Sequence, residues 1–290
     1  MEYTVMSYRS YVGASTTAGY TNETWSYAQS PMIYDIAALQ QLYGANYTTN
    51  SGNTVYSWSP STREMTINGV GQGAPGGNKI FLTVWDGGGN DTYDFSSYAS
   101  NLNVDLHPGA WTNTATNQLA KLYSDGSKIA AGNIANALLS QGDAHSLIEN
   151  AVGGSGSDVL TGNETTNLLK GGAGTDTLDG GSGADTLVGG AGADVFDFNS
   201  IKDTPAGARD TIQDFMQGVD HIDLSTIDAS TAITGDQAFS FIAAQSFTGQ
   251  SGQLNFADNL LSGDVNGDKM ADFQIYVSSV PALAATDFYL

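Results

Sequence analysis

The sequence contains no cysteine in 290 residues, so no disulfide can stabilise the fold. Basic residues are also scarce, since 9 lysines and arginines face 30 aspartates and glutamates, which leaves a formal net charge of −21. This acidic balance disfavours a polyanionic nucleic acid as partner and favours multivalent cations. No apolar run reaches the roughly 18 residues of a membrane span, and the first residues lack the basic and apolar regions of a cleavable signal peptide. We therefore expect neither a membrane span nor a Sec-type signal peptide.

Glycine, by contrast, is abundant, and it is concentrated in a nine-residue unit that occurs five times between residues 153 and 197. The unit reads G-G-x-G-x-D-x-U-x, with aspartate or asparagine always in position six and an apolar residue always in position eight. This is the signature of a calcium-binding parallel β-roll, in which six residues form a turn and three form a short strand. Turn carbonyls and the carboxylate offer the oxygen ligands that calcium prefers. The alternative is a flexible linker, but a linker has no reason to keep both positions in every unit.

Successive units lie on opposite sides of such a roll, so units n and n+2 stack. Asp158 should stack on Asp176 and Asp176 on Asp194, whereas Asn167 should stack on Asp185 in a weaker site, because an amide carries no charge. Acidity is concentrated here as well, since −10 of the net charge of −21 falls in residues 153–228. The candidate calcium ligands are the side chains of Asp158, Asn167, Asp176, Asp185 and Asp194 and the carbonyls of Gly154, Gly156, Gly172, Gly174, Gly181, Gly183, Gly190 and Gly192.

Outside the repeats, the sequence predicts one helix and several short strands. Ser30 suits an N-cap and Pro31 the first position of a helix over 32–43, whose packed face includes Tyr43 and which Gly44 ends. We therefore expect an all-β fold, a parallel β-roll flanked by β-sandwich-like strands, with a short helix near the N-terminus. The strands predicted outside the repeats lie at 79–85, 92–95, 210–215, 221–224, 238–243 and 271–277.

Five further segments carry a family resemblance, namely 4–8, 30–46, 85–95, 148–152 and 210–224. Residues 4–8 resemble the Met-turn of the serralysins, and residues 30–46 resemble the helix that closes their protease domain. Residues 85–95 resemble their first calcium loop, 148–152 the entry into the roll, and 210–224 the capping sandwich. The serralysins are secreted bacterial zinc metalloproteases of the metzincin group. The resemblance covers essentially the whole chain. It implies that residues 1–50 are a remnant of the metalloprotease domain and that 51–290 form the calcium-binding domain.

The zinc motif of that family is missing from this sequence. A metzincin requires H-E-x-x-H-x-x-G-x-x-H, and the three histidines, His107, His145 and His221, are isolated. The resemblance makes Met6 the Met-turn methionine and Tyr8 the tyrosine that can reach the zinc, both as vestiges of a zinc site. The chain thus resembles the C-terminal part of a serralysin. We expect no Zn²⁺, no catalytic residue and no proteolysis by the isolated chain.

Two further regions outside the repeats are expected to bind calcium. Asp86 and Asp91 bracket a glycine run, and the family resemblance places Asp86, Asp91 and the Gly88 carbonyl on one ion. It places Asp91, Glu149 and the Gly89 carbonyl on a second ion. The other site is an EF-hand-like loop, D-x-N-x-D, with a fourth acid at its ninth position. Acidic or glycine-rich hairpin turns are the alternatives. The ligands expected in this loop are Asp264, Asn266, Asp268 and Asp272.

The chain ends with an acidic residue followed by apolar ones, which resembles the type I secretion signal of the family. A terminal strand is the alternative. We expect a secreted, extracellular calcium-binding module that folds on binding calcium and whose partners are several calcium ions and the type I (ABC) secretion machinery. Two alternatives are part of an active zinc metalloendopeptidase whose catalytic half is supplied separately or upstream, and a calcium-dependent structural or adhesive protein. The expected secretion signal consists of Asp287, Phe288, Tyr289 and Leu290.

Overall fold

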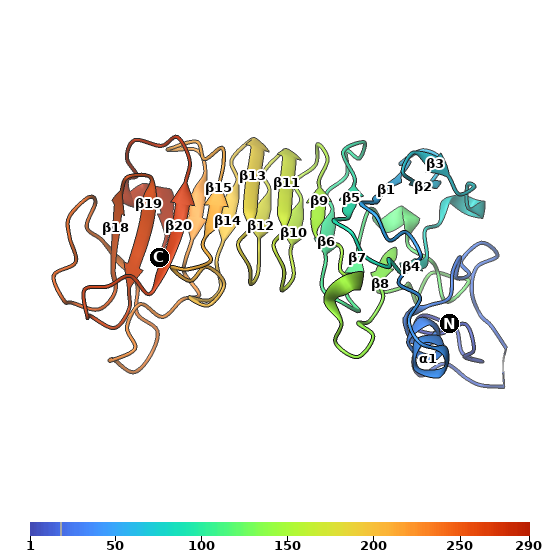
Figure 1. The fold of residues 1–290 in the computed structure, drawn as a ribbon. Coiled ribbons are helices and arrows are strands. Elements are labelled where there is room, and N and C mark those ends of the chain that lie inside the picture. The colour runs from blue at the N-terminus through green and yellow to red at the C-terminus, as the bar shows by residue number, and fades with distance from the viewer. Residues whose placement is uncertain (18) are drawn as a thin grey trace. The chain divides into compact units, whose positions relative to one another are not determined.

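The computed structural model describes residues 1–17 and 19–290, and its contacts divide them into two units. Unit 1 comprises Met1–Ser155 and unit 2 comprises Gly156–Leu290. Short strands predominate in both units (Figure 1), which confirms the predicted all-β class. Among the described residues, α1 (Ile33–Tyr43) is the one α-helix, and no described helix has the length and apolar character needed to cross a membrane.

Unit 1 contains two small sheets. Both sheets combine parallel strand pairs with antiparallel pairs at one edge. In spatial order the first sheet runs β9 (Asn150–Val152), β5 (Thr92–Asp94), β1 (Val55–Trp58), β2 (Met65–Ile67) and β3 (Val70–Gly71), and the second runs β4 (Leu82–Val84), β8 (Ile134–Asn136) and β7 (Trp111–Thr112). Unit 1 also contains β6 (Asn103–Asp105) and the short 3₁₀ turns η1 (Gly76–Asn78), η2 (Thr116–Gln118) and η3 (Ala144–Ser146).

Aromatic side chains form the core between the strands of unit 1. Tyr56 of β1 stands opposite Tyr93 of β5, and their rings meet edge to face with centroids 6.0 Å apart. Trp58 stacks on Phe95 at 5.1 Å, and all four side chains are buried. Such large rings bury much apolar surface per residue, which suits a unit built from very short strands.

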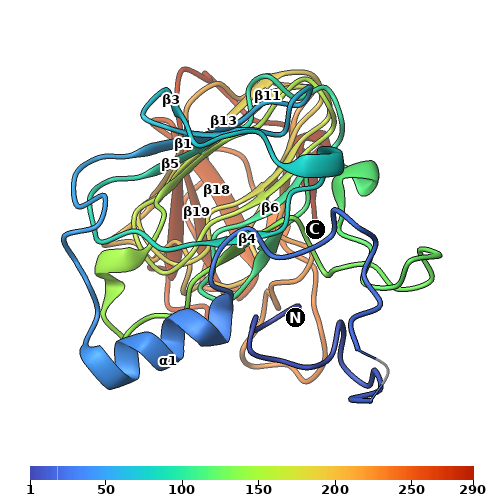
Figure 2. The same cartoon turned by 90° about the vertical axis from the view of Figure 1, so that its right-hand side faces the viewer.

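The helix α1 lies at the outside of unit 1 (Figure 2), and it begins differently from the prediction. Its N-cap is Met32, and the Asp35 carboxylate accepts the Met32 N–H at 2.9 Å and the Val5 N–H at 2.8 Å. The expected cap, Ser30, instead exchanges hydrogen bonds with the backbone of Thr83 in β4. The predicted cap was therefore wrong, because tertiary contacts engage the Ser30 hydroxyl. Tyr43 is also 83% exposed and does not lie on a packed face.

Unit 2 is a parallel roll that continues into an antiparallel sheet. One sheet runs β17 (Ser240–Phe241), β18 (Gln253–Ala257), β19 (Leu260–Asp264), β20 (Phe273–Val277), β15 (Asp210–Ile212), β13 (Thr186–Ala191) and β11 (Leu168–Ala173). The other runs β21 (Phe288–Tyr289), β16 (His221–Asp223), β14 (Val195–Asp197), β12 (Thr177–Asp179) and β10 (Val159–Thr161), and η4 (Ala285–Asp287) precedes β21. The repeat strands alternate between these two sheets.

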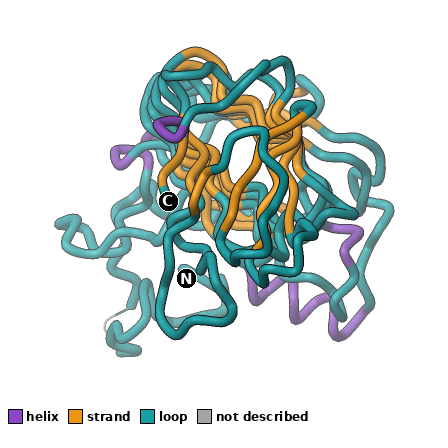
Figure 3. The backbone as a smooth tube through the Cα atoms, turned by 90° about the vertical axis from the view of Figure 1, so that its left-hand side faces the viewer, coloured by secondary structure: helices purple, strands orange, loops and turns teal. Residues whose placement is uncertain are grey.

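The predicted stacking of units n and n+2 is confirmed by the strand register. Leu160 of β10 stands opposite Leu178 of β12, and Leu169 of β11 stands opposite Leu187 of β13. The two layers of strands in unit 2 can be seen in Figure 3. The position-eight side chains point between them, and their packing forms the thin core that the repeat pattern predicts. The position-eight residues with no exposed surface are Leu160, Leu169, Leu178, Leu187 and Phe196.

Candidate calcium centres

The position-six aspartates of unit 2 form a ladder along one side of the roll. The backbone N–H of Asp158 donates to Oδ1 of Asp176 at 2.7 Å, and the N–H of Asp176 donates to Oδ1 of Asp194 at 2.9 Å. The N–H of Asp194 donates in turn to Oδ1 of Asp220 at 3.0 Å. Each carboxylate therefore lies against the turn of the preceding unit on the same side of the roll.

A second ladder runs along the opposite side. The N–H of Asn167 donates to Oδ1 of Asp185 at 2.7 Å, and the N–H of Asp185 donates to Oδ1 of Asp210 at 2.7 Å. The structure thus pairs Asn167 with Asp185, as the repeat spacing predicts. Because Asn167 contributes an amide, this end of the second ladder carries less negative charge than its counterpart on the other side.

The second oxygen of four ladder aspartates is buried without a hydrogen-bond partner. These oxygens are the Oδ2 atoms of Asp176, Asp185, Asp194 and Asp210. Burial raises the pKa of Asp176 to about 6, of Asp185 to about 7 and of Asp210 to about 8. An unpartnered buried carboxylate oxygen is costly, and a bound cation would offset that cost. Their chemistry fits calcium, which takes oxygen ligands in flexible geometry.

The glycines of the repeats make room for this arrangement. A Cβ atom on Gly189 would lie 2.5 Å from Oδ2 of Asp194, and one on Gly171 would lie 2.4 Å from Oδ2 of Asp176. The fourth-position Gly192 has φ +149°, and a Cβ there would lie 1.5 Å from the carbonyl oxygen of Gly174. Carbonyl and carboxylate oxygens can therefore lie against the next turn only because these glycines lack side chains.

The ladders extend beyond the five repeats, which the sequence analysis missed. Asp210 and Asp220 occupy the same place as a position-six aspartate, since Asp210 begins the roll strand β15 and Asp220 directly precedes β16. Asp214 adds a carboxylate that accepts the N–H groups of Gly189 at 2.9 Å and Gly190 at 2.8 Å. The sequence signal was available, because Asp210-Thr211-Ile212 and Asp220-His221-Ile222 keep the D-x-U pattern without the glycines.

A separate cluster of carboxylates lies in unit 1. Asp86 and Asp91 are buried beside each other, and Glu149 Oε2 accepts the Asp91 N–H at 2.6 Å. The structure therefore brings together the three acids of the predicted first calcium loop. Oδ2 of Asp91 is buried without a hydrogen-bond partner. The pKa of Asp91 rises to about 8, first because of burial and then because Asp86 and Glu149 add negative charge. A cation would relieve both effects.

Three backbone or hydroxyl oxygens near Asp91 were missed by the sequence analysis. The Thr54 hydroxyl lies 2.7 Å from the Gly52 carbonyl and 3.1 Å from the Asn50 carbonyl. The Thr54 N–H donates to Oδ1 of Asp91 at 2.7 Å, which brings this group next to the cluster. No sequence motif marks them, because two are main-chain atoms and the loop lies about forty residues before Asp91.

The predicted EF-hand-like loop is closed by hydrogen bonds of its own. Asp264 accepts the N–H groups of Gly267 at 2.6 Å and Lys269 at 3.0 Å, and Asp272 accepts the Val265 N–H at 2.7 Å. Lys269, which stands where glycine is usual, has φ +72°. The other expected ligands, Asn266 and Asp268, accept backbone N–H groups within the same loop. Calcium binding here stays a prediction, with less support from the structure than the ladders have.

The C-terminal tail is docked on unit 2. β21 extends the parallel sheet beyond β16, with Phe288 opposite Ile222. Asp287 is buried, and its carboxylate accepts N–H groups of Gly218 at 3.1 Å and Ala284 at 2.8 Å. The Phe288 ring packs on Phe241 with centroids 4.9 Å apart. The expected secretion signal is thus also a terminal strand, so the two interpretations of the tail are compatible.

The expected vestiges of a zinc site lie exposed in unit 1. Met6 is 80% and Tyr8 78% exposed. His107 and His145 lie on exposed loops beside Asp105 and Asp143, and His221 of unit 2 stacks on Tyr289. Nowhere in residues 1–17 and 19–290 do three histidine, cysteine, aspartate or glutamate side chains converge as a metal-binding group. In unit 1, Asp91 lies beside both Asp86 and Glu149, and each of the two expected ions would take only two of these acids together with a glycine carbonyl.

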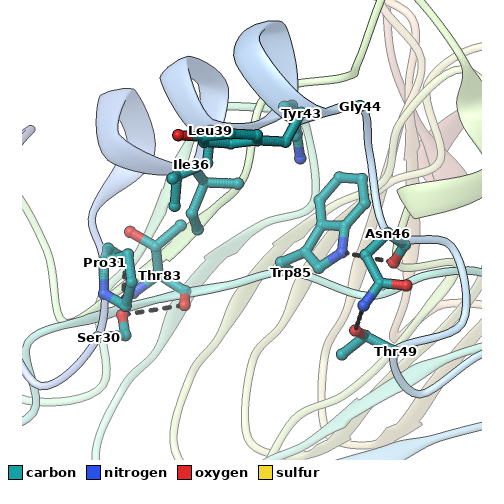
Figure 4. A pocket seen from close by; sticks show the side chains of 11 residues that line it. Ser30, Pro31, Ile36, Leu39, Tyr43, Gly44, Asn46, Thr49, Thr83 and Trp85 are labelled. Atoms are coloured by element: carbon teal, nitrogen blue, oxygen red, sulfur yellow. Dashed lines mark hydrogen bonds between the residues drawn. The ribbon is translucent and has the colours of Figure 1, made fainter.

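An apolar cavity of about 350 Å³ opens beside α1 (Figure 4). Ile36, Leu39 and Tyr43 of the helix form one wall, and the indole of Trp85 forms another. The Trp85 indole N–H donates to the Asn46 carbonyl at 3.2 Å, which fixes the ring at the cavity edge. This cavity contains no titratable carboxylate in its lining and is unsuited to binding a metal ion.

Residues 45–290 match the family model described as Peptidase M10 serralysin C terminal. The metalloprotease AprA of Pseudomonas entomophila is 43% identical over 90% of this chain and 49% of its own length. The serralysin of Photorhabdus laumondii is 39% identical over 94% of this chain and 49% of its own length. The chain therefore spans about half the length of these relatives. The solution structure of the AlgE6R3 subunit from the Azotobacter vinelandii mannuronan C5-epimerase aligns with a TM-score of 0.36 and 25% identity. The alignment covers 49% of this chain and 77% of that one, and the likeness is too weak to indicate function.

Proposed function

The chain belongs to the serralysin C-terminal family, and we propose that it is a calcium-binding module that folds on binding calcium and directs type I secretion. Its place of action is extracellular, and the isolated chain is not proteolytic. Family membership supports the general class. The calcium, export and folding roles are inferred from the residues themselves.

One observation supports calcium binding above all others. In both ladders, buried aspartates satisfy one oxygen with the backbone of the neighbouring turn and leave the other without a hydrogen-bond partner. A polar ladder that served packing alone would satisfy both oxygens or contain neutral side chains. The repetition of the same half-satisfied arrangement at Asp176, Asp185, Asp194 and Asp210 indicates a repeated cation site.

The same arrangement couples calcium binding to folding. Without calcium at neutral pH, the roll must bury carboxylates that repel one another, so the extended chain is favoured. With calcium bound, each ion replaces repulsion by coordination, and its binding free energy becomes folding free energy. Extracellular calcium modules typically bind in the range of about 10⁻⁴–10⁻³ M. A chain of this kind stays unfolded where calcium is scarce and folds after export.

A calcium titration followed by circular dichroism and calorimetry tests the proposal. Asp176→Asn removes the charge of one central ladder residue and should lower the calcium affinity about tenfold and reduce the number of bound ions. Asp236→Asn is the matched control, because Asp236 is exposed and lies outside both ladders. Equal β-structure of unit 2 in strong chelator and in calcium at neutral pH would contradict folding on calcium binding. Equal affinities of the two variants would contradict binding by the ladder.

Export is tested separately. The chain should leave cells that carry a type I system, and it should be retained when residues 287–290 are deleted. Retention of both forms, or export of both, would contradict a signal in the tail while leaving the calcium proposal intact. A fusion of a passenger protein to residues 156–290 would show whether the signal acts without unit 1.

A second candidate function is supported by apolar surface on unit 1. Met6, Tyr8, Leu42 and Tyr43 are each more than 70% exposed, and the apolar cavity beside α1 adjoins the last of these. Contiguous exposed apolar surface marks an interaction site, and Leu42 and Tyr43 are consecutive at the end of α1. We infer that a zinc-binding protease segment could cover it, with this chain as the other half of a metalloendopeptidase. Mixing with a partner chain that carries the zinc motif should then restore caseinolysis, and a persistent lack of activity would rule this out.

A further inference from the structure

A buried tyrosine hydroxyl touches the acidic cluster of unit 1. Tyr56 of β1 is 1% exposed, and its hydroxyl donates to Oδ2 of Asp86 at 2.6 Å. The side-chain amide of Asn50 donates to the same hydroxyl at 2.9 Å. The hydroxyl therefore has a defined donor and a defined acceptor, and its proton is directed to the carboxylate. This contact joins residues thirty positions apart in the chain.

The geometry of this contact is that of a strong hydrogen bond. O–H donors to ionised carboxylates lie at about 2.5–2.7 Å, which is shorter than neutral pairs. On the other side, the Gly88 N–H donates to Oδ1 of Asp86 at 2.7 Å. One donor on each oxygen fixes the rotation of the carboxylate, which is otherwise broad for this side chain. Each oxygen keeps a second lone pair for a metal ion.

The fixed orientation has a consequence for the neighbouring acid. Asp86 and Asp91 are both buried, with exposed fractions of 1% and 0%. Two buried carboxylates in contact repel each other unless a cation separates them. A carboxylate that is free to rotate would relieve the repulsion by turning away. The hydrogen bond from Tyr56 prevents this rotation, so the carboxylates of Asp86 and Asp91 stay oriented for binding a cation.

We propose that Tyr56 is a positioning residue of the unit 1 calcium site, which holds the Asp86 carboxylate facing Asp91 and thereby sets the calcium affinity. The inference rests on the calcium binding proposed for unit 1. In this proposal Tyr56 acts through the Asp86 carboxylate and not as a ligand of the ion. Hydrogen-bonded neighbours of metal ligands typically alter metal affinity about 10- to 100-fold when they are removed.

Tyr56→Phe tests the proposal, since it removes the hydroxyl and keeps the ring that packs on Tyr93. Tyr93→Phe is a matched control. Tyr93 is also fully buried, and its hydroxyl donates at 2.9 Å to Asn136 and not to a carboxylate. Both variants lose one buried hydroxyl of the same core, so their general effects on stability should be similar. Only the first should change calcium affinity.

The measurement must separate unit 1 from the ladders of unit 2. All four tryptophans, Trp25, Trp58, Trp85 and Trp111, lie in unit 1, and Trp85 directly precedes Asp86. Terbium luminescence excited through tryptophan therefore reports the unit 1 site in the full chain, and calcium that displaces terbium gives the calcium affinity. Neither Tyr→Phe variant removes a tryptophan, so the signal itself is unaffected.

The proposal predicts that Tyr56→Phe lowers the calcium affinity about 10- to 100-fold, where this affinity is calculated from the displacement curve and the terbium affinity of the same variant. The calcium affinity of Tyr93→Phe should stay within about threefold of that of the wild type. Equal shifts in the two variants would overturn it. Asn50→Gly gives a second test that keeps the positive φ of 51° at this position and removes the amide behind the hydroxyl. It should weaken calcium binding less than Tyr56→Phe, and an unchanged affinity would count against the proposal. Absence of tryptophan-sensitised luminescence in the wild type would instead overturn calcium binding by unit 1 itself.

Discussion

The backbone N–H of Asp176 donates to Oδ1 of Asp194 at 2.9 Å, while Oδ2 of Asp194 is buried with no hydrogen-bond partner. One oxygen thus joins neighbouring units of the roll, and the other is available to a cation. Because the same arrangement recurs along both sides of unit 2, its stability should depend on calcium at many points together. Four further consequences can be measured.

Gly189 should be intolerant of even a methyl group. Its φ is compatible with alanine, but a Cβ would lie 2.5 Å from Oδ2 of Asp194 and would displace the carboxylate. Gly189→Ala should raise the calcium concentration at the folding midpoint about tenfold or more, by analogy with other disturbances next to metal ligands. Gly207→Ala is the control, because a Cβ there would meet nothing within 4 Å and its φ is also unexceptional. A midpoint equal to that of the control would show that the carboxylate position is unimportant.

Asn167→Asp should strengthen calcium binding on the second ladder. The change adds a carboxylate at the position whose backbone N–H donates to Asp185, and it removes the side-chain N–H group that donates to Asn163 at 3.2 Å. Calorimetry should show a tighter site, because the charge of the ligands governs calcium affinity. In chelator the same variant should be less folded than the wild type, since the new charge is unopposed. Asn259→Asp, in the β18–β19 turn, controls for the added charge, and a matching gain there would contradict a local effect.

In chelator, acid should partly replace calcium. Burial raises the pKa values of Asp176, Asp185 and Asp210 to about 6, 7 and 8, well above the ordinary value of 3.8. The folded form therefore holds protons that the unfolded chain releases, so its stability is greatest at low pH and is lost as pH rises through about 6–8. Far-ultraviolet circular dichroism of the chelated protein should show more β-structure at about pH 5 than at pH 8. More structure at the higher pH would contradict the assigned burial.

The docked tail should contribute to the stability of unit 2. Phe288 is 6% exposed and packs on Phe241, so Phe288→Ala should cost about 3–5 kcal/mol in the free energy of unfolding. Urea unfolding in saturating calcium measures this cost. Tyr289→Ala should cost clearly less, because Tyr289 is 44% exposed even though it stacks on His221. Equal losses in the two variants would mean that the tail does not pack through Phe288.

Local pattern was sufficient to predict the roll and the stacking of its position-six side chains. Within each nine-residue unit the glycines, the position-six side chain and the apolar position eight have fixed local roles, so repetition alone implies stacking of units n and n+2. The structure confirms that stacking in the register of β10 with β12 and of β11 with β13. The same reasoning failed at α1, where Ser30 was predicted as the cap, because contacts with Thr83 and the carboxylate of Asp35 decided where the helix begins.

The class of fold and the two sides of the ladder could be predicted from the sequence, since both follow from residues close together in the chain. Only the tertiary structure decided that Asp210 and Asp220 extend the ladders, that Tyr56 reaches Asp86, and that Phe288 docks beside β16. These relationships join residues separated by about 25 to 66 positions without a fixed spacing. Which strand stacks on which depends on the burial of the whole core, and that is a property of the folded chain.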